Sequence, residues 1–407
     1  MSSKLNSKRK PFDKFVSIAS MLSAHGKSRE NHTIRFCASA NSDSISLQTH
    51  CSLVEAQITA NLYCEQEFQS NLDVEFQIDT IASNLSALPS AYFLQLNFDE
   101  ECLELHAATF NGGLLQDIED SYCAIDTHAK NIVLVKNTEL LTNYLLESKN
   151  LKQPIYKLNC RENHLSILRN IYCLMTKSSK PAESKFQLTS DDNFIYIELF
   201  VADIYARFKL FEQESDCEVK IVMENQQLKF LKFAMSVLMK EPINSVELNC
   251  DSGTTMMLKS DNICCNFKNL SSTIFFESPA QLDTDGWCEE SNSNLQNALS
   301  LIDVASRSID DIVTIQVKNG QLHAEVKTDH SLGSFCSKMT FLNNSVSGPA
   351  FVLSRTQLES ALNCFNSYEI LQLHGLLTHS SRLIIKSSFS NNIVMLSITE
   401  PRDRDPA

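Results

Sequence analysis

The feature that most constrains the fold is a short amphipathic helix that recurs along the 407-residue chain. The stretch FVLSRTQLESALNCF, residues 351–365, shows the design. Its first residues have the pattern of a strand, and Leu358, Ala361, Leu362 and Phe365 then lie on one helical face. Similar helical patterns start near residues 12, 79, 163, 228 and 294, and strand-like segments broken by turn residues follow them. The repeated unit is therefore predicted to be one helix plus a small antiparallel β-meander.

The spacing of these helices predicts the domain organisation. Successive helix starts, counting the one at residue 355, are about 67, 84, 65, 66 and 61 residues apart. Two units of about 65 residues make a domain of ordinary size. We expect three domains, at residues 1–154, 155–278 and 279–407, in the α+β class. The one long interval indicates an insertion at about residues 121–150, whose apolar pattern predicts an ordered segment packed on the outer rim.

Composition excludes several classes of protein. The 35 basic and 49 acidic residues give a net charge of −14, which argues against a surface that coats nucleic acid everywhere but allows a local basic face. The 14 cysteines are scattered without a CxxC pair, so we expect reduced, buried thiols. Neither His nor Cys spacing suggests a metal site, and no cofactor is predicted. With no long apolar run and no leader pattern, we expect a soluble, intracellular protein without membrane contact.

Three domains built from duplicated helix-plus-meander units resemble the bacterial DNA polymerase sliding clamps, the beta subunits of DNA polymerase III. The segment LQNALSLIDVASRSIDDIVTIQVKNGQLHAEVKTDHSLGSFCSKM, from Leu295, is similar to the first helix, strand, Asn-Gly hairpin and next strand of the family's last domain. The segment FVLSRTQLESALNCFNSYEILQL is similar to its second half. The resemblance implies outer sheets, inner helices and a chain that forms half of a ring. It also implies a non-enzymatic processivity factor that encircles double-stranded DNA as a head-to-tail homodimer.

In such a ring the inner helices face DNA, so the Lys and Arg residues of this acidic chain should gather on those helices. Contacts of this kind go to phosphates and not to base edges, because a clamp slides over any sequence. The alternative is that these Lys and Arg residues only form the solvated side of amphipathic helices. The second helix carries no base. The predicted DNA-binding residues are Lys14, Lys27, Arg29, Arg169, Lys177, Lys180, Lys229, Lys232, Lys240, Arg307 and Arg355.

The family also holds a polymerase and a clamp loader by short peptides in a pocket between its second and third domains. By resemblance, FVADIYARFKL stands where the family has Thr-Asp-Gly-His-Arg-Leu, with Asp203 retained and the next four residues changed. The chain end NIVMLSITEPRD stands where the family closes on Met-Pro-Met-Arg-Leu. An ordinary buried edge strand is the alternative for this end. The resemblance implies a partner-peptide groove at Tyr205, Arg207, Val394, Leu396 and Ile398, and we expect Tyr205, Val394, Leu396 and Ile398 to form its apolar floor.

Catalytic motifs are not indicated. The stretch FNGGLLQD, residues 110–117, lacks the spacing of a phosphate-binding loop and is interpreted as a hairpin turn. The carboxylate pairs Asp310–Asp311 and Glu289–Glu290 are expected in solvated loops. Two other functions stay open. One is a clamp-fold interaction or checkpoint protein that does not close a ring on DNA, and the other is a viral processivity factor, which normally has two domains per chain.

Overall fold

The computed structural model divides the chain into two compact units. Unit 1 comprises Met1–Glu162 and Lys229–Leu270, and unit 2 comprises Asn163–Leu228 and Ser271–Ala407. No described helix is long and apolar enough to cross a membrane. The structure describes residues 3–23, 33–51, 56–64, 68, 71–98, 102–111, 114–126, 156–191, 193–212, 219–240, 246–250, 256–267, 270, 287–305, 312–319, 321–327, 335–340, 347–376 and 381–397.

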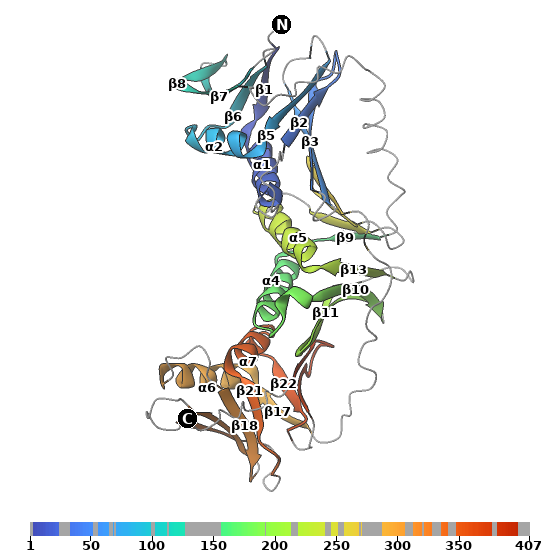
Figure 1. The fold of residues 1–407 in the computed structure, drawn as a ribbon, viewed down its shortest axis with the longest axis vertical. Helices are drawn as coiled ribbons and strands as arrows, with labels where there is room; N and C mark the ends of the chain where they lie inside the picture. The colour runs from blue at the N-terminus through green and yellow to red at the C-terminus, as the bar shows by residue number, and fades with distance from the viewer. Residues whose placement is uncertain are drawn as a thin grey trace, which may run out of the picture. The chain divides into compact units, whose positions relative to one another are not determined.

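The same five-element order, strand, helix and three-stranded meander, occurs six times in the described chain (Figure 1). The first two copies are β1 (Ser3–Lys8), α1 (Arg9–Ser23), β2 (Thr33–Ala38), β3 (Ser44–Cys51) and β4 (Ala56–Tyr63), then β5 (Leu72–Gln77), α2 (Ile78–Ala87), β6 (Phe93–Phe98), β7 (Cys102–Asn111) and β8 (Leu114–Asp126).

The middle pair of copies contains one additional 3₁₀ turn. The elements are β9 (Tyr156–Asn159), α4 (Glu162–Thr176), η1 (Pro181–Glu183), β10 (Lys185–Asp191), β11 (Phe194–Val201) and β12 (Ile204–Glu212), then β13 (Lys220–Glu224), α5 (Asn225–Leu238), β14 (Glu247–Cys250), β15 (Met256–Lys259) and β16 (Ile263–Phe267).

The last pair of copies repeats the order again. The elements are β17 (Trp287–Ser291), α6 (Asn292–Ala305), β18 (Ile312–Lys318), β19 (Gln321–Lys327) and β20 (Phe335–Thr340), then β21 (Phe351–Ser354), α7 (Arg355–Leu362), β22 (Ile370–His374), β23 (Arg382–Ser387) and β24 (Ile393–Ser397). Each of the six helices begins within about three residues of its predicted start, so the α+β class and the repeated unit are confirmed.

A strand precedes every helix, whereas the sequence pattern indicated one only at residues 351–354. This first strand pairs with the meander of the other copy in its pair: β1 with β6, β5 with β2, β9 with β14, β13 with β10, β17 with β22 and β21 with β18. Because each copy supplies the outermost strand of its neighbour's sheet, the two copies of a pair complete each other. The three-domain division at residues 154 and 278 stays a prediction.

The strands form two eight-stranded and two four-stranded antiparallel sheets. Unit 1 holds the sheet β5-β2-β3-β4-β16-β15-β14-β9 and the four-stranded sheet β1-β6-β7-β8. Unit 2 holds the sheet β13-β10-β11-β12-β24-β23-β22-β17 and the four-stranded sheet β20-β19-β18-β21. In both eight-stranded sheets the two halves join through the third strand of a meander, β4 with β16 and β12 with β24.

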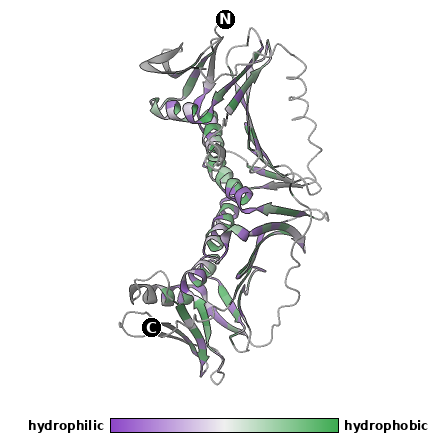
Figure 2. Cartoon of the chain, viewed as in Figure 1, coloured by the Kyte–Doolittle hydropathy of each residue, from purple (hydrophilic) through white to green (hydrophobic). Residues whose placement is uncertain are grey.

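Aromatic residues fill the core between helices and sheets. In unit 1 the fully buried Phe36 ring lies 6.3 Å from Phe12 of α1 and 5.6 Å from both Phe76 and Phe98. Figure 2 shows hydrophobic and hydrophilic residues mixed along the helices and strands, as expected for elements with one buried face. The periodicity of each segment therefore decides which of its residues enter the core.

Two predicted hairpins are confirmed and one expectation is wrong. Asn111 pairs with Leu114 around the Gly-Gly turn, and Lys318 pairs with Gln321 around Asn319, whose φ of 51° suits an Asn-Gly turn. Glu289 and Glu290 do not lie in a loop but in β17. Asp310 and Asp311 lie outside the described residues. The insertion predicted at about residues 121–150 begins inside β8, which extends to Asp126, and the rest of it lies outside the described residues.

Candidate nucleic-acid interface

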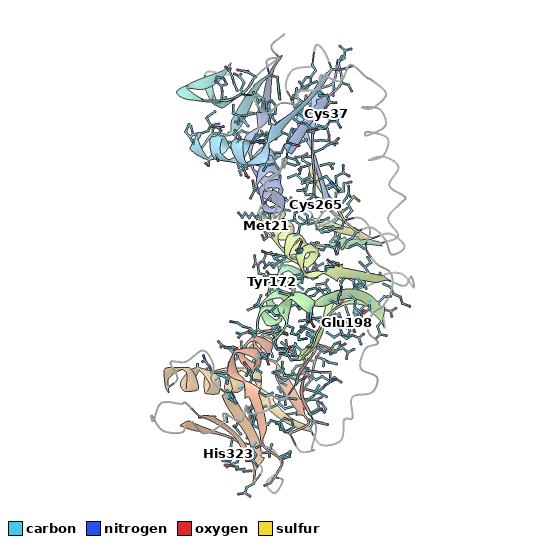
Figure 3. The ribbon with its side chains drawn as sticks, viewed as in Figure 1. Met21, Cys37, Tyr172, Glu198, Cys265 and His323 are labelled. Carbon is cyan, nitrogen blue, oxygen red and sulfur yellow. The ribbon has the colours of Figure 1, made fainter. Side chains whose placement is uncertain are left out.

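A basic stripe runs along α1 in unit 1. The helix buries Phe12, Phe15, Val16, Ile18 and Ala19 against the sheet. Outside this buried face, Lys10, Lys14, Ser17 and Met21 repeat at helical spacing and are exposed or half-buried, and Met21 is labelled in Figure 3. Pro11, Asp13 and Ser20 are also half-buried. The predicted residue Lys14 thus lies on the solvent side of its helix.

The helix α5 shows the same arrangement without an opposing acid. Its sequence NQQLKFLKFAMSVL contains two lysines and no acid. Phe230 packs on Phe267 of β16 at 5.5 Å, which anchors the apolar face. Lys229, Lys232 and Ser236 are half-buried on the opposite side at helical spacing. This stripe places two cations on a rigid helix outside its apolar face, as phosphate contacts require.

In unit 2 the helix α4 presents Arg169 in a stripe of exposed residues. Leu165, Leu168 and Ile171 are buried, and the ring of His164 packs on Phe211 of β12 at 4.3 Å. Figure 3 labels Tyr172, a half-buried residue of the same helix. The exposed stripe consists of Glu162, Ser166, Arg169, Cys173 and Thr176, so it carries one acid and one base.

Four other predicted bases lie at helix ends or in connections. Lys177 and Lys240 are exposed just beyond the ends of α4 and α5. Lys180 is exposed, but its Nζ lies 3.1 Å from Glu183, which offsets its charge. Arg355 is half-buried in the first turn of α7.

The remaining three predicted bases, Lys27, Arg29 and Arg307, lie outside the described residues. The helices that carry predicted DNA-binding residues also carry three described acids. Asp13 lies 3.2 Å from Arg9 on α1, Glu162 is exposed in the first turn of α4, and Glu359 is exposed on α7. The helices α2 and α6 contain Asp79 and Asp303 and neither Lys nor Arg. Positive charge on the helices is therefore concentrated on α1 and α5.

The predicted apolar floor of a peptide groove is not assembled by the structure. β12 and β24 pair so that Ile204 faces Leu396 and Tyr205 faces Met395. Because side chains alternate along a strand, Tyr205 lies on the opposite face of the sheet from Val394 and Leu396. Val394 and Leu396 are fully buried, on the face that packs against α7. Ile398 lies outside the described residues.

Arg207, also predicted for the groove, belongs to a polar cluster on the Tyr205 face of the sheet. Its guanidinium donates to Asp191 at 2.6 Å, lies 3.6 Å from Glu198 and stacks 4.0 Å above the ring of Tyr196. Glu198, labelled in Figure 3, is only 2 % exposed and accepts a hydrogen bond of 3.0 Å from the Tyr205 hydroxyl. A buried carboxylate requires such partners, so these contacts give Arg207 a structural role.

Asp203 organises a junction within unit 2 that sequence patterns missed. Its carboxylate accepts hydrogen bonds from the Ser178 hydroxyl at 2.5 Å, the Ser179 amide at 2.9 Å and Gln357 Nε2 at 2.6 Å. Gln357 Nε2 also donates to the Lys177 carbonyl at 3.0 Å. These bonds tie the end of α4 and the turn before β12 to α7. No periodicity signals them, since Gln357 lies 154 residues from Asp203.

This network predicts a pH-dependent contribution to stability. Burial acts to raise the pKa of Asp203, but the hydrogen bonds from Ser178, Ser179 and Gln357 outweigh it and lower the pKa. Asp203→Asn should lower the free energy of unfolding by about 1–2 kcal/mol near neutral pH, the reduced range for a partly exposed carboxylate. A lowered pKa contributes stability above the unfolded value of about 3.9 and loses it as the pH falls through the folded value.

Urea unfolding of wild type and Asp203→Asn across the acid range measures this difference. The gap between the two proteins should be constant near neutrality and close in acid, while the exposed control Glu359→Gln stays near wild type. A gap that widens as the pH falls would contradict the assignment of a stabilising, ionised Asp203.

Most cysteines with described side chains are buried thiols. Burial raises the pKa of Cys37, Cys64 and Cys288 to about 12, which leaves little thiolate at neutral pH. Cys173 is exposed on the α4 stripe beside Arg169. It therefore offers a labelling position within the candidate interface.

Solved structures of bacterial sliding clamps match this architecture over almost the entire chain. The Caulobacter crescentus DNA polymerase III beta subunit matches with a TM-score of 0.71 at 10% identity, covering 98% of this chain and 100% of that one. The Bacillus subtilis DNA polymerase sliding clamp matches with a TM-score of 0.70 at 11% identity, covering 98% and 99%. The Pseudomonas aeruginosa DNA polymerase III subunit beta matches with a TM-score of 0.69 at 10% identity, covering 98% and 100%.

No protein-family model matches the sequence, and no curated protein does. Identities of 10% to 11% show the fold alone. The chain has the fold of the bacterial sliding clamps and a sequence far removed from theirs.

Proposed function

We propose that this protein is a DNA sliding clamp, a non-enzymatic processivity factor that encircles duplex DNA and tethers a replicative DNA polymerase. The observation that carries the proposal is the pair of unfinished sheets. Each eight-stranded sheet joins two four-stranded halves through third meander strands. The two remaining four-stranded sheets end on β8 and on β20, which are also third meander strands without a described partner on their outer side.

Pairing β8 of one chain with β20 of a second chain would complete two more eight-stranded sheets. Such a contact joins two different surfaces, β8 of one chain and β20 of the other. When two copies meet head to tail, the two contacts close a ring. Closure would also cover sheet edges that otherwise expose unpaired backbone groups. Three domains from each chain would then form the ring.

The basic stripes of α1 and α5, with the exposed Arg169 of α4, support the DNA part of the proposal. A sliding clamp needs phosphate contacts that are weak, salt-sensitive and independent of sequence, and cations on rigid helices supply them. Topology would provide retention. Binding of the polymerase and of a clamp loader through short peptides, and work in the cytoplasm at the nucleoid, belong to the same proposal and rest on the fold.

The ring proposal makes a prediction about mass and topology. Light scattering should give about twice the 45.8 kDa chain mass at micromolar concentration. Protein loaded on nicked circular DNA by its clamp loader should remain bound in high salt, and linearising the DNA should release it. A monomer that never survives high salt on circular DNA would instead favour a clamp-fold interaction protein that does not close.

A further inference from the structure

A basic cavity of about 300 Å³ opens at the start of α1, inside unit 1. Its lining includes Lys8, Lys10 and Lys14 together with Tyr92 and the hairpin residues Asp261 and Asn262. This volume is at the lower end of the range of about 300–1,000 Å³ for small-ligand sites.

Three separate chain segments form the cavity. The β1–β6 ladder sets Lys8 opposite Phe93, and the Arg9 amide donates to the Tyr92 carbonyl at 3.0 Å. The tip between β15 and β16 is closed by a 2.8 Å bond from the Ser260 amide to the Ile263 carbonyl. It is fixed to β4 by a 3.0 Å bond from the Asn61 amide to the Asn262 carbonyl. The cavity walls are therefore held by backbone hydrogen bonds.

The charge of the cavity suits a phosphate group. Three lysines line it against one acid, Asp261, so positive charge remains in excess. Lys10 also lies in the first turn of α1, whose positive dipole end adds to the attraction for an anion. Arg9 is directed elsewhere, toward Asp13 and the Leu85 carbonyl at 3.1 Å, and helps to hold the helix start in place.

Tyr92 gives the cavity a second chemical character. Its side chain is 59 % exposed, and its ring is supported from one side by Phe93 at 4.8 Å in an edge-on contact. An exposed aromatic ring beside lysines is the combination that binds unpaired nucleotides, with the phosphate on the cations and the base stacked on the ring. Bases of a duplex are already stacked on each other and cannot use the ring in this way.

We propose that this cavity binds one nucleotide unit of single-stranded nucleic acid, with its phosphate at Lys8, Lys10 and Lys14 and its base on Tyr92. The inference goes beyond the proposed clamp function, because it requires neither ring closure nor duplex DNA. It would let the protein hold an unpaired strand next to a duplex.

The test uses the full-length protein and a short fluorescein-labelled oligothymidylate, with binding followed by anisotropy. Tyr92→Ala should weaken binding about 5- to 150-fold, the equivalent of one lost stacking contact. Tyr92→Phe should restore it, because stacking needs the ring and not the hydroxyl. The double variant Lys8→Gln, Lys10→Gln should lower the salt slope of binding by about 0.7, the value for one single-strand phosphate.

Matched controls separate the cavity from general surface effects. Tyr63→Ala removes a tyrosine that is 68 % exposed elsewhere in unit 1, and Lys318→Gln with Lys386→Gln removes two lysines from unit 2. Both should bind like wild type. Unchanged oligothymidylate binding by Tyr92→Ala would overturn the proposal, as would equal weakening of duplex binding.

This outcome is independent of the ring. A monomeric protein whose oligothymidylate binding depends on Tyr92 would refute the clamp function and support the cavity. A closed dimer whose oligothymidylate binding is unchanged in Tyr92→Ala would support the clamp function and refute the cavity proposal.

Discussion

Reversing the charge of Arg169, Lys229 and Lys232 to Glu should lower the salt slope of duplex binding by about 2.7, because each phosphate contact contributes about 0.9. If wild type and variant converge near 1 M salt, this slope difference corresponds to about a 500-fold loss of affinity at 0.1 M. The loss should be the same for any DNA sequence, since the contacts go to phosphates. Duplex binding measured over a salt series, with processive synthesis by the cognate polymerase, gives both quantities.

The matched control places the same charge change on strands. Lys259, Lys318 and Arg382 are exposed residues of β15, β18 and β23. Their triple reversal to Glu should leave the salt slope within error of wild type. If both triple variants lose the same affinity, net charge and not the helix stripes governs binding. Full polymerase stimulation by the Arg169, Lys229 and Lys232 variant would contradict a DNA-facing role for these helices.

Leu396→Ala should lower the free energy of unfolding of unit 2 by about 2–5 kcal/mol. Leu396 is fully buried and lies between Ile204 and Leu383 in the sheet, so truncation leaves a cavity and removes apolar contacts. A residue on the floor of an open groove would give a different result, with partner binding lost and stability nearly unchanged. Urea unfolding followed by far-ultraviolet circular dichroism distinguishes the two.

Ile370→Ala is the control for this truncation. Ile370 lies in β22 of the same sheet and is 38 % exposed, so its removal should cost well under half as much. If Leu396→Ala has the stability of wild type and no longer binds a polymerase peptide, the result would support the prediction that Leu396 lines the peptide groove.

Side-chain alternation explains why the predicted floor residues Tyr205 and Leu396 do not share one face of the sheet. The resemblance aligned Tyr205 and Leu396 with positions that share a pocket in the family, and both are apolar. Their faces depend on the pairing of β12 with β24, where Tyr205 lies opposite Met395 and not opposite Leu396. A shift of one residue in the pairing register moves a side chain to the other face of the sheet. No local pattern in either strand predicts that register.

The sequence by itself determined the local elements of this protein. Helical periodicity located the six α-helices of the described residues, and the Gly-Gly and Asn-Gly pairs located two hairpins, because these signals depend on neighbours within a few residues. The same periodicity placed Lys14, Arg169, Lys229 and Lys232 away from the buried faces of their helices. Whether DNA contacts them stays a prediction.

Only the tertiary structure decided how distant segments meet. The exchange of first strands, the contact of Asp203 with Gln357 and the approach of Asn262 to Tyr92 and Lys8 each join segments far apart in the chain. Local propensity is satisfied equally well by many such pairings. The choice among them depends on which strand edges and apolar faces bury one another, and that energy exists only once the whole chain is assembled.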